Sequence, residues 1–155
     1  MIQAWRLCQA AHIATAFNGD GARLYGGRWN NKGQPVIYTA SSLSLAALEV
    51  LAHADTDLMP NDFFSFAVSI PDDKIVVERL DPNKLSADWQ VQYPPLSCQQ
   101  AGNEWLAHGK SAILSVPSVL IPGEWNFLLN PTHKDFKRCV VSPPQPFQFD
   151  SRLWG

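Results

Sequence analysis

Strand-like segments follow one another along this chain, and few helical segments separate them. We expect strands where β-branched and aromatic residues gather: 1–8, 35–40, 63–70, 74–80, two pieces of 111–122 around Pro117, and a closing strand with a proline interruption within 137–150. A doubly wound fold requires regular alternation of strands and helices, which this order lacks. The chain is therefore predicted to have an α+β fold with a largely antiparallel or mixed sheet.

Two segments have the apolar spacing of a helix instead. The clearer one is "SSLSLAALEVLAHA", residues 41–54, in which apolar side chains recur at helical spacing and one of the first two serines can cap the first turn. A second helix is expected over about 96–109. Residues 10–35 contain five glycines and are expected to be mostly loop, and residues 124–136 are expected to be rich in turns. The two helices are expected to flank the sheet.

The size, charge and cysteine content exclude several classes of protein. The 155 residues fit a single domain, 1–155. The formal net charge is −2 and no long run of Lys or Arg is present, which argues against direct nucleic-acid binding. Cys8, Cys98 and Cys139 form no CxxC pair, which argues against a zinc site and a disulfide scaffold. With no signal peptide and no apolar run of membrane-spanning length, we expect a cytoplasmic protein with no metal and no membrane contact.

The segment "LYGGRWNNKG", residues 24–33, places a permanent charge in a stretch with little regular structure. Arg28 can bind a phosphate or carboxylate through two parallel hydrogen bonds. Gly26 and Gly27 before it allow the backbone to approach a ligand closely. The segment is not a GxGxxG fingerprint. It favours an anion site, and the alternative is a structural arginine that bonds loop carbonyls.

Glu49 lies away from the apolar stripe of the predicted helix. His53 follows one turn later on the same side, and Ser42 precedes by about two turns, which makes a narrow polar strip. A carboxylate on a rigid helix suits the stabilisation of developing positive charge. Tyr38, eleven residues earlier, offers an aromatic face and a hydroxyl. The alternatives are a solvent-facing glutamate and a half-buried strand tyrosine.

Ser118 follows Pro117 in a third segment with candidate site residues. Its hydroxyl could donate to a phosphate, but no GxSxG elbow surrounds it, so a hydrolase nucleophile is poorly supported. The alternative is a hydroxyl that belongs to a turn. Asn126 lies further along the same segment.

Three separated motifs together resemble one family. "GGRWN", "VIYTASSLSLAALEVLAH" and "VPSVLIPGEWNFLLNPTHKDF" occur in the order found in the RES domain family, which is named for an arginine, a glutamate and a serine. The resemblance runs from "WRL" at 5–7 to "FQFDSRLW" at 147–154. It implies a fold similar to that of ADP-ribosyltransferase toxins.

The resemblance also implies a function. RES proteins are toxins of bacterial type II toxin–antitoxin modules, with an Xre-type helix-turn-helix antitoxin as partner. They degrade NAD+, their substrate rather than a cofactor, by hydrolysis or phosphorolysis at the nicotinamide–ribose bond, and some transfer ADP-ribose to a protein. A homodimer of the toxin within the complex stays open. The implied catalytic residues are Glu49, Arg28 and Tyr38, and the implied substrate-binding residues are Arg28, Tyr38, Ser118, His53 and Asn126.

The chemistry of NAD+ agrees with these residue types. Arg28 and Ser118 suit the pyrophosphate, and the face of Tyr38 suits the cationic nicotinamide ring. Glu49 suits the positive charge that develops on the ribose when the bond to nicotinamide breaks. Two alternatives remain: a protein ADP-ribosyltransferase with the same site, and a non-enzymatic interaction module in which Arg28 and Glu49 form a structural ion pair and the aromatic residues form a partner surface.

Overall fold

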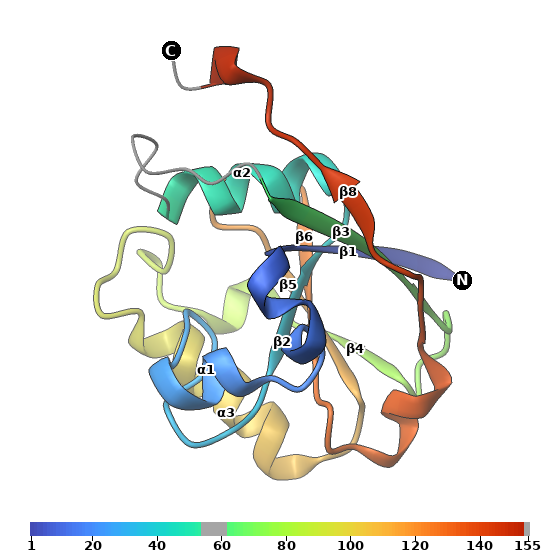
Figure 1. Ribbon diagram of the computed structural model, residues 1–155. Coiled ribbons are helices and arrows are strands. Elements are labelled where there is room, and N and C mark those ends of the chain that lie inside the picture. Colours follow the sequence, from blue (N-terminus) through green and yellow to red (C-terminus); the bar gives the residue numbers. More distant parts are fainter. Residues whose placement is uncertain (54–61, 154–155) are drawn as a thin grey trace.

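The computed structural model describes residues 1–53 and 62–153, and an eight-stranded mixed sheet is the main feature of this part (Figure 1). The strands are β1 (Ile2–Gln9), β2 (Ile37–Ala40), β3 (Phe63–Ile70), β4 (Val77–Arg79), β5 (Ile113–Pro117), β6 (Trp125–Leu129), β7 (Val140–Val141) and β8 (Gln145–Phe147). Their order is β4-β5-β6-β2-β1-β3-β7, with β8 also paired to β3. The β4–β5 pair is parallel and the other pairs are antiparallel, which confirms the predicted α+β class.

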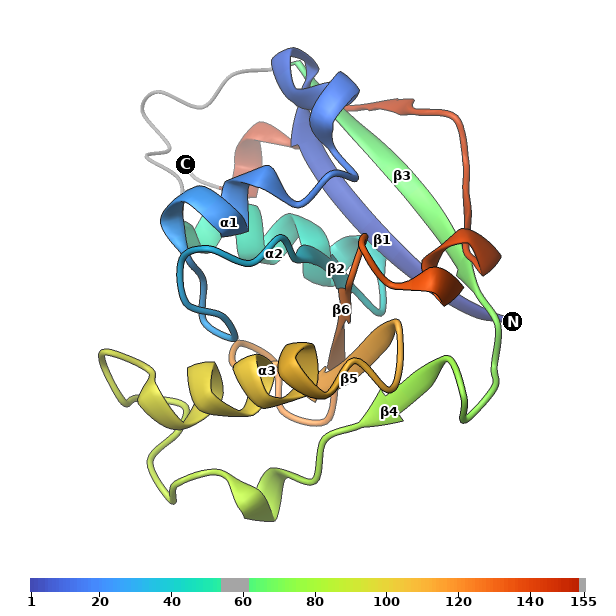
Figure 2. The same cartoon turned by 90° about the horizontal axis from the view of Figure 1, so that it is seen from below.

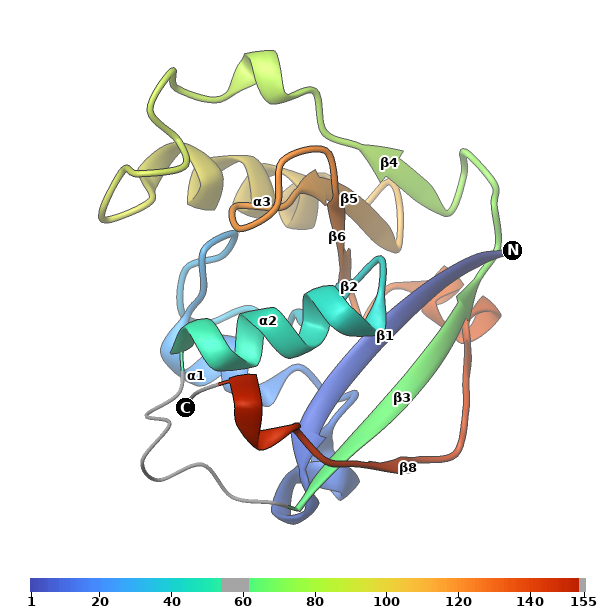
Figure 3. The ribbon, with the colours of Figure 1, turned by 90° about the horizontal axis from the view of Figure 1, so that it is seen from above.

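Three α-helices accompany this sheet in the described residues: α1 (Asp20–Tyr25), α2 (Leu43–His53) and α3 (Leu96–His108). Figures 2 and 3 show α2 beside β1, α3 beside β5, and the segment from α1 to β2 between the two longer helices. The Ser42 hydroxyl caps α2 by accepting from the Leu45 amide at 3.1 Å. The left-handed conformation of Gly109, with φ of 61°, ends α3.

The two longer helices cover separate parts of the core. The α2 cluster contains Leu45 and Ala46 of the helix, packed with Leu7 of β1 and Ala40 of β2. A second cluster joins α3 to the other side of the sheet, and its buried members are Trp29, Val36, Leu85, Cys98, Trp105, Leu114, Val116 and Leu128. The space between α2 and α3 is therefore bordered by two rigid, well-packed units.

Residues 10–35 contain more regular structure than the sequence predicts. They hold a 3₁₀ turn, Ala10–Thr15, and the six-residue helix α1. Gly19 and Gly26, with φ of 75° and 72°, lie at the two ends of α1. A helix of fewer than two turns is too short to produce an apolar periodicity, so the pattern of glycines alone predicted a loop.

The prediction for residues 111–136 was wrong in two places. The second strand-like piece after Pro117 is a turn, because the Ser118 hydroxyl accepts hydrogen bonds from the Leu120 and Ile121 amides, both at 3.1 Å. The start of the predicted turn-rich segment is β6, which pairs with both β5 and β2. A strand buried on both faces has a continuous apolar run and little alternation, and "WNFLL" has that form.

The remaining elements agree closely with the predicted ones. The strands at residues 1–8, 35–40 and 63–70 and both predicted helices are confirmed, although the expected last helical residue, Ala54, lies outside the described residues. The strand expected over 74–80 is shortened to β4, and the closing strand is split into β7 and β8. No helix in residues 1–53 and 62–153 is long and apolar enough to cross a membrane.

Candidate active site

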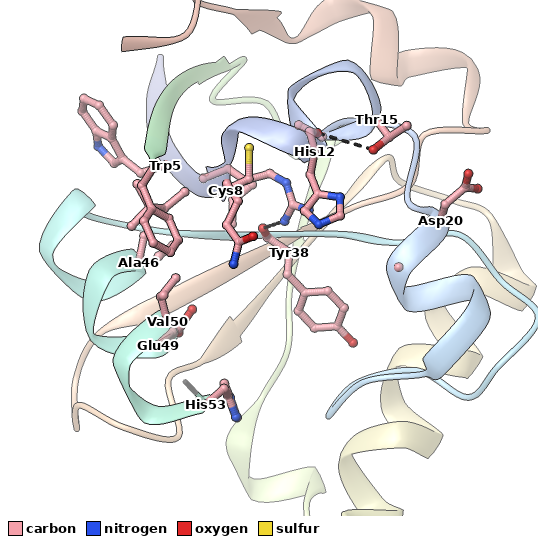
Figure 4. A pocket seen from close by; sticks show the side chains of 18 of the residues that line it. Trp5, Cys8, His12, Thr15, Asp20, Tyr38, Ala46, Glu49, Val50 and His53 are labelled. Carbon is pink, nitrogen blue, oxygen red and sulfur yellow. Dashed lines mark hydrogen bonds between the residues drawn. The ribbon is translucent and has the colours of Figure 1, made fainter. Parts of the chain in front are cut away.

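Two neighbouring pockets meet between α2 and the segment from α1 to β2. The β1 pocket, of about 720 Å³, is lined by β1 residues such as Arg6. The loop pocket, of about 860 Å³, is lined by the Gly26–Trp29 loop. Four residues line both pockets: Tyr25, Tyr38, Glu49 and His53. Figure 4 shows Glu49 and His53 on the same side of α2, with the Tyr38 ring projecting into the space beside them.

Tyr38 holds the loop that carries Arg28. Its hydroxyl donates to Asn30 Oδ1 at 2.5 Å and accepts from the Trp29 amide at 3.1 Å. Burial raises the pKa of Tyr38 far above its ordinary value, so the hydroxyl stays protonated. A side chain at Gly27 would place its Cβ 2.5 Å from the Tyr38 oxygen, so this close approach requires a glycine.

Helix α3 supports the same loop from the other side. Gln99 donates to the Gly27 carbonyl at 3.1 Å, and the Asn103 side chain accepts from the Asn31 amide at 3.1 Å. A Cβ at Gly102 would lie 1.7 Å from the Trp29 carbonyl oxygen, so helix and loop backbone are in direct contact. Trp29 is only 3% exposed and packs in the α3 cluster while lining the loop pocket. It is both core and pocket wall.

Arg28 lines the loop pocket and has few partners inside the protein. Its Nη1 donates to the Trp89 carbonyl at 3.3 Å. No carboxylate of the described residues lies within ion-pair distance of its guanidinium. The ion pair with Glu49 that the non-enzymatic alternative assumed is therefore absent from this part of the chain. A guanidinium in a pocket without an internal counterion is suited to an anionic ligand.

Glu49 reaches the junction of the two pockets from the middle of α2. Its Oε1 accepts a hydrogen bond from Asn126 Nδ2 at 2.6 Å, and Asn126 also donates to the Thr39 carbonyl at 3.2 Å. Burial raises the pKa of Glu49, and the Asn126 hydrogen bond acts in the opposite direction. The polar strip expected on α2 is thus divided, because Glu49 and His53 line the pockets while Ser42 caps the helix.

Ser118 and His53 occupy contrasting positions. Ser118 is 2% exposed, lines neither pocket, and uses its hydroxyl oxygen within the turn after β5. This turn presents Val119 and Leu120 to the loop pocket. His53 is exposed at the end of α2 and lines both pockets. The structure therefore gathers Arg28, Tyr38, Glu49, His53 and Asn126 around one space and leaves Ser118 behind it.

Arg6 is a pocket residue that the sequence did not single out. It lies on β1, and its Nη1 donates to the Tyr38 carbonyl at 2.9 Å. Its Nε is enclosed without a hydrogen-bond partner, and burial lowers its pKa. A charged residue inside the strand segment "AWRLC" was the available signal, but strand alternation alone does not reveal whether such a residue faces solvent or a pocket.

Comparisons with known proteins agree on the family and fold. The sequence model of the RES domain matches residues 3–150. "Toxin Res" of Photorhabdus laumondii is 40% identical over 150 residues, which are 96% of this chain and 95% of that protein. "Toxin Res" of Yersinia enterocolitica is 41% identical over 96% of this chain and 97% of that protein. The "Prs ADP-ribosylating toxin" of a Sphingobium strain is 32% identical over 96% and 94%.

A solved structure has the same fold. It is a chain of the M. tuberculosis MbcT–MbcA toxin–antitoxin complex, with a TM-score of 0.76 and 20% identity over 97% of this chain and 85% of that chain. The likeness confirms the predicted ADP-ribosyltransferase-like α+β fold with a mixed sheet and flanking helices. With a domain match over residues 3–150 and relatives about equally long at 40% identity, this chain belongs to the RES domain family.

Proposed function

We propose that this protein is the toxin of a bacterial type II toxin–antitoxin system and degrades NAD+ by cleaving its nicotinamide–ribose bond. One observation carries the proposal: the Glu49 carboxylate lies where two pockets meet, beside Tyr38 and in the same pocket as an unpaired Arg28. The names of the relatives from Photorhabdus and Yersinia support the toxin role.

The proposed reaction needs a negative group beside the ribose and a positive group at the phosphates. When the bond from C1 of the ribose to nicotinamide breaks, its electron pair leaves with the ring and positive charge develops on the ribose. Ionised Glu49 stabilises that charge, and Arg28 binds the pyrophosphate. Water or inorganic phosphate then bonds to C1, and the proton of the attacking group passes to solvent. NAD+ is consumed as a substrate, with no further cofactor.

Tyr38 takes a narrower role in this proposal than its hydroxyl first implied. The oxygen already accepts from the Trp29 amide and donates to Asn30. Only the ring remains available to a ligand, and an aromatic face suits the cationic nicotinamide. Tyr38 therefore shapes the pocket and contributes its ring, and proton transfer is left to other groups.

A toxin of this kind requires a partner that silences it in the cytoplasm. We propose an Xre-type helix-turn-helix antitoxin that covers the mouth of the loop pocket, where the exposed side chains of Tyr25, Tyr93 and Leu120 lie. The similar fold was solved in a toxin–antitoxin complex, which supports such a partner. DNA binding by the complex would come from the antitoxin, and a homodimer of this chain within the complex remains a prediction.

A second function is favoured by one relative. The Sphingobium protein, 32% identical to this chain, carries the name of an ADP-ribosylating toxin. The same site could form the same ribosyl cation and pass it to a protein side chain instead of water or phosphate. Labelled NAD+ added to a cell lysate separates the two functions, because transfer labels protein bands and degradation releases small products.

Proton NMR of NAD+ incubated with the purified protein, with and without inorganic phosphate, tests the proposal. Free nicotinamide with ADP-ribose is expected for hydrolysis, and phosphate-dependent ADP-ribose-1″-phosphate for phosphorolysis. Glu49→Gln should lose the activity, whereas Glu104→Gln, an exposed change outside both pockets, should keep it. Unchanged NAD+ with folded wild-type protein contradicts the proposal, and absence of any NAD+ binding would favour an interaction module.

A further inference from the structure

Asn126 makes contacts that a purely ligand-binding side chain would not make. It lies on the central strand β6, opposite Ala40 of β2. Its amide nitrogen donates to the Thr39 carbonyl at 3.2 Å and to Glu49 Oε1 at 2.6 Å. An asparagine amide carries two protons, and both are used here inside the protein. The amide nitrogen therefore has no proton left for a ligand.

We infer that Asn126 is the positioning residue of the pocket, which holds one oxygen of the Glu49 carboxylate and leaves the other oxygen for the ligand. The role in catalysis rests on the proposed function of Glu49. In the part of the chain that the structure describes, Oε1 of Glu49 accepts one hydrogen bond and Oε2 accepts none. The two oxygens, equivalent in a free carboxylate, are thus assigned different tasks.

The anchor of this contact is stiffer than the carboxylate that it holds. Asn126 is 8% exposed, and its second hydrogen bond ends on the backbone of β2, which is itself paired to β6. A glutamate side chain has three rotatable bonds and reaches the pocket from a separate helix. Without Asn126 the carboxylate would sample several positions, and a group that must face a reacting atom loses effect with small displacements.

Asn126 also affects the charge of Glu49. The other titratable or charged groups that line the two pockets are His53 on α2, Arg6 and Cys8 on β1, Tyr38 on β2, and Arg28, His12 and Asp20 on the segments between them. None of these forms an ion pair with Glu49 in the described residues. The Asn126 amide is therefore the polar contact that lowers the pKa of Glu49 against the effect of burial.

Two variants give pH dependences of opposite sign. In Asn126→Ala the pKa of Glu49 should rise, so the acidic limb of the activity profile should move to higher pH. In Asn126→Asp the new carboxyl group lies beside Glu49, and such a pair shares one proton because both groups cannot easily ionise. Protonated Asp can still donate to Glu49, so this variant should lose activity as the pH rises and the shared proton leaves.

The direct test is carbon NMR of the Glu49 carboxyl group in ¹³C-labelled protein, assigned with Glu49→Gln. Asn126→Ala should raise the measured pKa of Glu49, and Asn83→Asp, the same asparagine-to-aspartate change at an exposed site outside both pockets, should leave it unchanged. This titration needs no NAD+ cleavage, so failure of the proposed function and failure of the positioning contact are distinguished.

The wild-type protein supplies a test that does not depend on the folding of any Asn126 variant. The side-chain NH₂ of Asn126 should titrate with the same pKa as the Glu49 carboxyl group, because the two groups share a hydrogen bond. A flat response of that NH₂ would overturn the inference. So would a folded Asn126→Ala protein with an unchanged pKa of Glu49, or an Asn126→Asp profile with the sign of the wild type.

Discussion

The loop that carries Arg28 and the helix that carries Glu49 are held in different ways. The loop is fixed by the Tyr38 hydroxyl, by α3 side chains and by direct backbone contact with Gly102. The Glu49 carboxylate is held by a single hydrogen bond from Asn126. The position of the positive group is therefore determined by many contacts, whereas the negative group depends on one contact and its ionisation can be tuned.

Gly102→Ala should break the loop side of this comparison with the largest effect. Its Cβ would lie 1.7 Å from the Trp29 carbonyl oxygen, so α3 and the loop must separate. We expect a loss of at least about 3 kcal/mol in the free energy of unfolding. Urea denaturation measures it. Gly21→Ala, at a helical glycine with open space around its Cβ, is the control and should be neutral or slightly stabilising.

Tyr38→Phe removes the hydroxyl that joins β2 to the loop. The Trp29 amide and Asn30 Oδ1 both lose a partner, which should cost about 1–3 kcal/mol of unfolding free energy. Activity should fall together with stability, since the loop carries Arg28. Tyr93→Phe, at a tyrosine that is 90% exposed, should change stability by less than about 0.5 kcal/mol. Equal thermal melting of the two variants would show that the hydroxyl does not hold the loop.

Arg28→Gln should separate binding from stability. Its one hydrogen bond, to the Trp89 carbonyl, contributes little to the fold, so the melting temperature should barely move. Loss of a charged, two-pronged partner for phosphate should weaken ADP-ribose binding by about 10- to 100-fold. Calorimetric titration measures this, with Arg138→Gln, an exposed change outside both pockets, as the matched control. Unweakened binding would remove Arg28 from the phosphate site.

Glu49→Gln should have the smallest effect on stability, and one that depends on pH. Because burial raises the pKa of Glu49 in the folded state, ionisation of this group disfavours folding above its ordinary pKa. The variant should therefore melt at a higher temperature than the wild type at neutral pH. The gain should disappear below about pH 4, where the wild-type group is protonated in both states. A gain that persists or grows at low pH would contradict the buried-carboxylate interpretation.

Much of the fold could be predicted because its longest elements have strong local patterns. β1, β3, α2 and α3 each show clear strand or helix signals, and the absence of regular alternation excluded a doubly wound sheet. The misplaced elements are those whose form depends on distant partners. β6 is recognisable only through its pairing with β2 and β5, and α1 is delimited by glycines whose conformation the sequence does not state.

The candidate site divides in the same way. The motifs pointed to Arg28, Tyr38 and Glu49, and the structure places all three around one space. The sequence could not reveal that the Tyr38 hydroxyl is already engaged, nor that Ser118 uses its oxygen within a turn. Arg6 was missed because its importance comes from the pocket that it faces, and a single charged residue on a strand carries no motif.

Strand β2 has only four residues, yet every charged group of the site is tied to it. The Tyr38 side chain holds the Arg28 loop, the Tyr38 carbonyl accepts from Arg6, and the Thr39 carbonyl anchors the amide that binds Glu49. The spacing of these charges is therefore a property of one short backbone segment. We expect a one-residue insertion there to displace all of them together, whereas the exposed rim at Tyr25, Tyr93 and Leu120 can be replaced freely. New partners and acceptors would then be acquired at the rim, over an unchanged arrangement of charges.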